Sequence, residues 1–267
     1  MSHFQSILVI GCGNMAGAML EGWLAGGVDA ARFTVVDPSR DVAPGGIAVL
    51  REIPADGAFD AILLGVKPQN LPAIAVPLAP LAGSGSTVLS LLAGVELETL
   101  RHRFAEARAV VRIMPNLAAA LGKAPIALAE EGLDDGGRAA LVELLQPLGE
   151  PQWVAEDRFD LVTALAGSGP AFVYRFIDAL SAGAIRLGLP EAQARALALA
   201  MVEGSAALAA QSEHAPGRLA DMVASKGGVT RKGLDVLDER EALVRLVTDT
   251  LRAARDRSAE MARETRD

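Results

Sequence analysis

The first 160 residues alternate short apolar runs with segments of helical periodicity. The apolar runs cover residues 7–10, 33–36, 61–66, 87–92 and 109–114, with weaker runs at 126–129 and 152–155. The helical segments between them cover residues 72–81, 97–104 and 137–148. Unbroken apolar runs are typical of strands buried on both faces of a parallel sheet. We therefore predict a doubly wound α/β domain over residues 1–160.

The rest of the chain shows helical patterns only. These patterns cover residues 170–187, 191–211, 216–224, 230–237 and 239–262. Several faces of these helices are apolar. A domain of roughly 105 residues cannot bury this much apolar surface by itself. We expect residues 161–267 to form an all-helical domain that dimerises through a large apolar surface.

The composition excludes several classes of protein. Of the 267 residues, 51% are hydrophobic and 22% are charged, and the formal net charge is −8. The four lysines are scattered, so no basic stripe indicates nucleic acid as a partner. No apolar stretch is long enough to cross a membrane without charges, and we expect no secretory signal in the first residues, since they lack a basic segment followed by a cleavable apolar run. A cytoplasmic location is expected, and the single cysteine, Cys12, suits that reducing compartment.

A glycine-rich loop separates the first apolar run from the first helix. Gly11, Gly13 and Ala16 have the spacing G-x-G-x-x-A. Gly11 permits a sharp turn off the strand, and Gly13 allows the backbone to approach a pyrophosphate. Ala16, with Gly17 beside it, is expected to let the helix pack closely against the sheet.

The start of this helix is the expected phosphate site. Asn14 and Met15 begin the helix, whose unpaired N–H groups and positive dipole end favour an anion. The alternative is an ordinary strand-to-helix turn. An acidic residue roughly 20 positions further on, Asp37, completes the dinucleotide pattern and favours the binding site.

The choice between the two nicotinamide dinucleotides stays open at this stage. Asp37 favours NADH, because a carboxylate at the end of the second strand accepts from the ribose 2′-hydroxyl and repels a 2′-phosphate. Ser39 and Arg40 follow closely and offer groups that bind such a phosphate. We therefore expect NADPH or NADH as the cofactor.

Three further clusters are not explained by core packing alone. They are residues 111–116, 166–171 and 225–230. The first is a strand end, with the Asn116 amide expected to point toward the cofactor edge of the sheet. The other two are small-residue turns that precede helices. Simple helix punctuation is one interpretation of these two, and a backbone N–H site for a carboxylate is the other.

Side chains for acid–base or nucleophilic catalysis are scarce. His3 is terminal, His102 lies in a charged patch and His214 lies in a polar segment. No cluster of histidine, cysteine or acidic residues has metal-ligand spacing, so no metal site is expected. If the chain is an enzyme, a cofactor is expected to supply the reactivity while the protein positions the substrate.

These motifs together resemble the pyrroline-5-carboxylate reductase family. The matching stretches are GCGNMA at 11–16, VKP at 66–68, RIMPN at 112–116, TALAGSGPAF at 163–172 and SKGGVT at 225–230. The resemblance implies an oxidoreductase that reduces 1-pyrroline-5-carboxylate to L-proline with NAD(P)H, the last step of proline biosynthesis. It also implies an N-terminal Rossmann domain, a C-terminal helical dimerisation domain and often an assembly of five dimers.

The resemblance assigns roles to individual residues. The threonine whose hydroxyl contacts the ring nitrogen, and so serves catalysis, corresponds to Thr230. The remaining substrate-binding positions correspond to Ser225, Lys226, Gly227, Gly228 and Val229, with Glu213 as an acidic residue before the loop. Further cofactor-binding positions correspond to Val66, Lys67, Pro68, Asn116, Ser168, Gly169 and Pro170.

The chain departs from the family pattern at three positions. Lys226 stands where the family usually has proline, and Val229 fills a position that usually holds a small residue or threonine. The substrate loop is then either less rigid, or Lys226 adds a cation near the carboxylate. Leu117 replaces a usual threonine, which removes one hydrogen bond.

Other functions remain open on the sequence. The β-hydroxyacid dehydrogenases share this plan but need a lysine after the glycine turn, and residues 169–188 contain none. Another cyclic imine or ketimine reductase fits the same motifs with a different ring. A sensor that binds NAD(P) without turnover is the non-enzymatic alternative.

Overall fold

The computed structural model describes residues 4–266, and the chain divides into two compact units. The first unit comprises the residues up to Ser168 together with those from Ala253 onward. The second comprises Gly169–Arg252. The residues from Ala253 onward, which we expected in the helical domain, therefore group with the first unit. His3 lies outside the described residues.

Within residues 4–266, eight strands form one sheet in the order β3-β2-β1-β4-β5-β6-β7-β8. Their bounds are β1 Ile7–Ile10, β2 Phe33–Val36, β3 Val49–Leu50, β4 Ala61–Leu64, β5 Thr87–Ser90, β6 Ala109–Met114, β7 Ala124–Glu131 and β8 Gly149–Trp153. The pairs from β3 to β6 are parallel, β7 is antiparallel to β6, and β8 is parallel to β7. The order 3-2-1-4-5-6 is that of the Rossmann fold, so the predicted fold class is confirmed.

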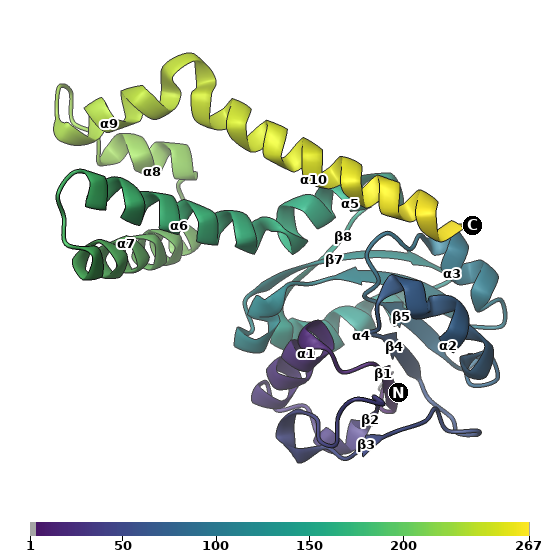
Figure 1. The fold of residues 1–267 in the computed structure, drawn as a ribbon. Helices are drawn as coiled ribbons and strands as arrows, with labels where there is room; N and C mark the ends of the chain where they lie inside the picture. Colours follow the sequence, from purple (N-terminus) through teal and green to yellow (C-terminus); the bar gives the residue numbers. More distant parts are fainter. Residues whose placement is uncertain (1–3, 267) are drawn as a thin grey trace. The chain divides into compact units, whose positions relative to one another are not determined.

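Helices cover both faces of this sheet (Figure 1). Helices α1 (Asn14–Ala25) and α4 (Asp135–Leu145) share one apolar core with the β1 residues Ile7 and Val9. Helices α2 (Leu71–Leu78) and α3 (Leu97–Arg103) share the other core with Leu8 and Ile10. Alternate residues of β1 are thus buried on opposite faces, as its unbroken apolar run predicts.

The strand register brings three chain turns to one edge of the sheet. Ile10 pairs with Val36 of β2 and with Leu64 of β4. Because all three strands run in the same direction, the residues that follow them leave the sheet together. This edge is the carboxyl end of the strands, where open α/β sheets bind ligands.

The second unit is helical throughout its regular structure. It contains α6 (Gly169–Arg186), α7 (Glu191–Gln211), α8 (Pro216–Met222), α9 (Val229–Asp238) and the first part of α10 (Ala242–Arg266). Helices α6 and α7 lie side by side (Figure 1). Of the described residues in α6 to α9, only Ser181, Ala194 and Ala198 are buried.

The remaining helical segments are short. They are α5 (Phe159–Val162) and the 3₁₀ turns η1 (Ala30–Arg32), η2 (Pro44–Gly46), η3 (Pro68–Asn70), η4 (Leu117–Leu121), η5 (Gln146–Leu148), η6 (Glu156–Arg158) and η8 (Glu239–Glu241), with the π-helix η7 (Thr163–Gly167). None of the helices within residues 4–266 combines the length and the apolar character needed to cross a membrane.

Candidate functional site

A pocket of about 830 Å³ opens at the carboxyl edge of the sheet. Its lining includes Gly11 and Gly13 from the glycine loop, Asp37 from the end of β2, and Gly65 from the end of β4. These residues come from three separate segments that the strand register aligns. The structure therefore brings together the parts of the dinucleotide motif that the sequence predicted.

Gly11 makes the turn from β1 into this pocket. Its φ of +85° lies in the left-handed region that favours glycine, and its amide donates to the Val36 carbonyl over 2.8 Å. A Cβ at this position would lie 2.8 Å from Val66 Cγ1. A side chain would therefore clash with the end of β4, and glycine fits the sharp turn that the sequence predicts here.

Gly65 is a second close approach that the sequence analysis missed. A Cβ there would lie 2.5 Å from the Gly11 carbonyl oxygen and 2.9 Å from the Ala16 Cβ. Its signal in the sequence was a glycine directly after the apolar run of β4, at the predicted ligand edge. Gly65 and Ala16 together let α1 approach the sheet.

The first turn of α1 presents free backbone N–H groups. Gly13 is the N-cap of α1, and this residue has no side chain to form a capping hydrogen bond. Gly13 and Asn14 are exposed, Met15 is half-buried and Ala16 is buried. The first amides of a helix lack intrahelical partners, so this turn suits the phosphates of a dinucleotide.

Gly17 does not share the close packing that we expected of Ala16 and Gly17 together. Apart from its chain neighbours and the backbone of its own helix, no described atom lies within 4 Å of a Cβ built on Gly17. The second close contact of α1 is made by Gly22, where a Cβ would lie 2.1 Å from the Ala119 carbonyl oxygen of η4. The expectation for Gly17 was therefore wrong, whereas Ala16 lies against Gly65 as expected.

Asp37 is buried at the rim of the pocket, with only 7% of its surface exposed. Its Oδ2 accepts from the Cys12 amide over 2.8 Å, and its Oδ1 accepts from the Ser39 amide over 2.8 Å and the Ser39 hydroxyl over 2.6 Å. Burial alone would raise the pKa of Asp37. The hydrogen bonds from Ser39 and Cys12 and the positive charge of Arg40 outweigh burial and lower the pKa.

Cys12 itself is fully buried in the core beneath α1. Burial raises the pKa of its thiol, and the nearby carboxylates of Asp37 and Glu21 add to this effect against Arg40. A buried thiol with a raised pKa is unreactive. Cys12 therefore fills the loop, and its amide, not its sulfur, serves the site.

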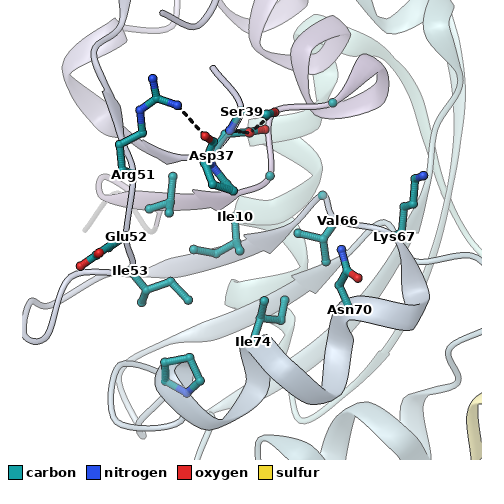
Figure 2. Close-up of a pocket in the computed structure, with 16 residues that line it drawn as sticks. Ile10, Asp37, Ser39, Arg51, Glu52, Ile53, Val66, Lys67, Asn70 and Ile74 are labelled. Carbon is teal, nitrogen blue, oxygen red and sulfur yellow. Dashed lines mark hydrogen bonds between the residues drawn. The ribbon is translucent and has the colours of Figure 1, made fainter. Parts of the chain in front are cut away.

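Figure 2 shows how the charged side chains lie around this pocket. Arg51 and Glu52 flank the side of Asp37, while Lys67 and Asn70 lie on the opposite side. Val66 also lines the pocket, whereas Pro68 begins η3 and lines a separate pocket of about 440 Å³. Sequence reasoning missed several lining residues, namely Arg51, Glu52, Ile53, Asn70, Ile74 and Pro77.

Asn116 follows β6, and its side chain is bonded to the protein at both ends. Its Oδ1 accepts from the Ala118 amide over 2.9 Å, which caps η4, and its Nδ2 donates to the Ala166 carbonyl over 3.0 Å. Only 5% of its surface is exposed. The amide does not project from the sheet edge as we expected, because it ties the strand end to the π-helix η7.

Ser168 directly follows this π-helix. Its amide donates to the Thr163 carbonyl over 3.0 Å, which is the wide turn of a π-helix. Single π-turns occur frequently at functional sites. Ser168 is the last residue of the first unit, and Gly169 and Pro170 open α6 in the second.

Arg112 belongs to the predicted strand-end cluster at residues 111–116, and its side chain binds other parts of the protein. Its Nη1 donates to Glu156 Oε1 over 2.7 Å, and its guanidinium lies 4.0 Å from the centre of the Phe159 ring. Glu156 Oε1 also accepts from the Leu97 amide over 3.1 Å. This pair of a buried arginine and a half-buried glutamate joins β6, η6 and α3 away from the dinucleotide pocket.

In the second unit, residues 225–230 form a tight turn into α9. The Gly228 amide donates to the Ser225 carbonyl over 2.9 Å, and Gly227 has a φ of +72°. Gly228 is the N-cap of α9, and Val229 and Thr230 are its first two residues. Lys226, Val229 and Thr230 are exposed. The turn thus presents the backbone N–H groups of a helix start and the hydroxyls of Ser225 and Thr230 at an open surface.

The other candidate side chains lie at exposed positions. Glu213 lies between α7 and α8, with His214 next to it, and His102 lies in α3. Residues 4–266 bring together no group of three or more histidine, cysteine or acidic side chains that could hold a metal ion.

Comparisons with known proteins agree with this geometry. A family model described as pyrroline-5-carboxylate reductase dimerisation matches residues 156–261. A pyrroline-5-carboxylate reductase of Methanosarcina acetivorans is 32% identical over 271 residues, covering 97% of this chain and 99% of the relative. One from Aquifex aeolicus is 37% identical over 182 residues, covering 68% of each chain.

Solved structures show the same arrangement of elements. A pyrroline-5-carboxylate reductase from Coxiella burnetii superposes with a TM-score of 0.88 at 28% identity, covering 97% of this chain and 99% of that one. A Plasmodium falciparum pyrroline carboxylate reductase with NADP bound superposes with a TM-score of 0.84 at 21% identity, covering 98% and 100%, which shows the shared fold. From its near full-length relatives, this chain belongs to the pyrroline-5-carboxylate reductase family.

Proposed function

We propose that this protein reduces 1-pyrroline-5-carboxylate to L-proline with NADPH or NADH, the last step of proline biosynthesis. The observation that carries this proposal is the dinucleotide edge, where Gly11 and Asp37 meet the start of α1, in a chain related over its length to this family. A nicotinamide dinucleotide held by the turn at residues 11–16 and by Asp37 would supply the hydride for the carbon of the C=N bond. The ring nitrogen is protonated, so the product is a secondary amine.

The protein's own task is to hold the substrate rather than to attack it. A protonated cyclic imine accepts a hydride without a protein nucleophile, which fits the scarcity of catalytic side chains. We assign the substrate carboxylate to the turn at residues 225–229, whose N–H groups suit an anion. We assign the Thr230 hydroxyl to the ring nitrogen and Glu213 to the substrate side of the site.

We assign the cofactor phosphates to the turn at residues 11–16 and the ribose to Asp37. The remaining contacts, toward the nicotinamide, are assigned to Val66, Lys67, Pro68, Asn116, Ser168, Gly169 and Pro170. For Asn116 we assign the contact to its backbone, since both ends of its side-chain amide are hydrogen-bonded within the protein.

We further propose that the protein is a homodimer joined through its helical domain, over residues 161–267, with five dimers forming a decamer. The support is the apolar surface that α6, α7 and the start of α10 leave exposed. The reaction is placed in the cytoplasm, since the one cysteine, Cys12, is a free buried thiol.

The test is the oxidation of each reduced dinucleotide when 1-pyrroline-5-carboxylate is added to the purified protein, with proline measured as product. Thr230→Ala should lower kcat roughly 10-fold or more, because a polar contact and the substrate orientation are lost together. Thr230→Ser keeps the hydroxyl and should retain most activity. Wild-type kcat in Thr230→Ala would contradict the assigned role.

Two other outcomes would redirect the assignment. Faster reduction of a cyclic imine with another ring would make the protein a different imine reductase. Dinucleotide binding without reduction of any imine would make it a sensor.

A further inference from the structure

We infer that this protein selects NADH over NADPH, and that Asp37 is the residue that discriminates between them. The inference rests on the proposed function to the extent that the pocket at the sheet edge binds a nicotinamide dinucleotide. It goes further, because it names which of the two dinucleotides this chain is built to hold. Three features of the pocket carry it: the hydrogen bonds of Asp37, its burial, and the placement of the cations nearby.

The Asp37 carboxylate has one acceptor position left. An ionised carboxylate offers about four lone-pair sites. Three are taken by the Cys12 amide, the Ser39 amide and the Ser39 hydroxyl. The carboxylate lines the pocket, so the fourth is available to a ligand donor. The ribose 2′-hydroxyl of NADH supplies such a donor, whereas a 2′-phosphate supplies more negative charge.

Burial strengthens the repulsion between the Asp37 carboxylate and a phosphate. With only 7% of its surface exposed, Asp37 is poorly screened by water. Its hydrogen bonds lower its pKa, so the carboxylate is negative at neutral pH. Glu52 adds a second negative charge to the lining on the same side of the pocket (Figure 2). A phosphate dianion placed here would meet two carboxylates.

The groups that could bind a 2′-phosphate are committed elsewhere. Both donors of Ser39 point to Asp37. The Arg51 guanidinium is bound by the Asp41 carboxylate and the Pro38 carbonyl. Arg40 lines a different pocket, which it shares with the carboxylate-bearing Glu21 and the start of α1. The sequence suggested Ser39 and Arg40 as phosphate ligands. Ser39 does line this pocket, but both of its donors are taken by Asp37, and Arg40 lines the other pocket.

The test is the dissociation constant of each reduced dinucleotide, measured by calorimetry on the purified protein without imine. NADH should bind at least about tenfold more tightly than NADPH, the effect of one hydrogen bond to a charged group. Asp37→Asn should bring the two constants within about threefold of each other. Asp41→Asn releases Arg51 and should strengthen NADPH binding while leaving NADH binding unchanged.

Asp56→Asn is the matched control, because Asp56 is exposed and does not line the pocket. It removes the same charge and should leave both constants as in the wild type. If Asp37→Asn does not fold, Asp41→Asn and the wild type still decide the inference. NADPH binding as tight as or tighter than NADH in the wild type would overturn it, as would a selective loss of NADPH affinity in Arg40→Gln.

The failure of this inference is distinguishable from that of the proposed function. Tighter NADPH binding with normal imine reduction would overturn the inference alone. Tighter NADH binding without imine reduction would support the inference and overturn the proposed reaction. Binding of neither dinucleotide would overturn both.

Discussion

The two units of this protein treat their apolar side chains in opposite ways. In the first, the strands are packed between two cores that hold large side chains such as Trp23, Phe104 and Phe159. In the second, apolar side chains such as Tyr174, Leu208 and Val244 are exposed. The first unit has the interior of a self-sufficient domain, whereas the second exposes the apolar surface that the proposed homodimer would cover.

The candidate sites of the two units also differ in how deeply they are buried. The dinucleotide pocket is built from buried groups whose hydrogen bonds are given by their own unit, as Asp37 shows. The turn at residues 225–230 is exposed and depends on its backbone geometry. Changes in the first unit should therefore act through packing and hydrogen bonds, and changes in the second through assembly.

The largest effect is expected from charges on the exposed apolar face of α10. Val244 and Val247 are three positions apart and lie on one side of that helix. Replacing both with glutamate should weaken the dimer by more than about 100-fold, because two carboxylates would be buried unpaired. Analytical ultracentrifugation at micromolar concentration measures this.

The matched control places the same change on the first unit. Val42 and Val76 are also exposed valines, and Val42→Glu with Val76→Glu should leave the sedimentation unchanged. A wild-type protein that sediments as a monomer would remove the contrast between the two units.

The next effect tests the packing of the first unit at α1. Gly22→Ala would place a Cβ 2.1 Å from the Ala119 carbonyl oxygen and should lower the free energy of unfolding by about 1–3 kcal/mol. Gly17→Ala, on the same helix, meets no described atom within 4 Å and should raise stability by about 0.5–1 kcal/mol. Denaturant unfolding measures the unfolding free energy of both variants. Equal changes in the two variants would contradict the close contact at Gly22.

An effect of similar size is expected from the link between β6 and the π-helix. Asn116→Ala removes the cap of η4 and the bond to the Ala166 carbonyl, and should cost about 1–3 kcal/mol of unfolding free energy. Asn116→Asp keeps the acceptor for Ala118 but places a buried carboxylate oxygen against the Ala166 carbonyl oxygen, so its cost at neutral pH should be higher. Parallel unfolding and kcat measurements would show whether stability and turnover change together.

The smallest effect concerns the pH dependence of stability. Because the folded state lowers the pKa of Asp37 from its ordinary 3.8, the carboxylate stabilises the fold above that pH. This contribution is lost as the pH falls through the lowered pKa. The unfolding free energy of the wild type minus that of Asp37→Asn should be constant from pH 8 to about 5 and shrink at lower pH. A difference that grows on acidification would contradict the assigned hydrogen bonds.

Local patterns predicted much of the fold. Strands β2 and β6 have the predicted bounds, and α7 does too, because their periodicity is uninterrupted. The two-residue strand β3 escaped prediction because it is too short for any pattern. The last predicted helix begins at Ala242 instead of residue 239, because Arg240 and Glu241 have positive φ values.

The candidate site was predicted less evenly. The glycine turn and the acidic residue after β2 follow from backbone requirements that are visible in the sequence. The lining residues Glu52, Ile53 and Ile74 carry no motif, and only the packing of α2 and of the segment after β3 brings them to the pocket.

The sequence by itself determined the fold class and the place of the dinucleotide turn, since these depend on periodicity and on local backbone conformation. Its motifs also carried the resemblance to the family. The tertiary structure decided which partner each polar side chain takes. Asp37 meets Cys12, 25 residues away, and Asn116 meets Ala166, 50 residues away. Such bonds form between segments that only the folded sheet brings together, so no local pattern announces them.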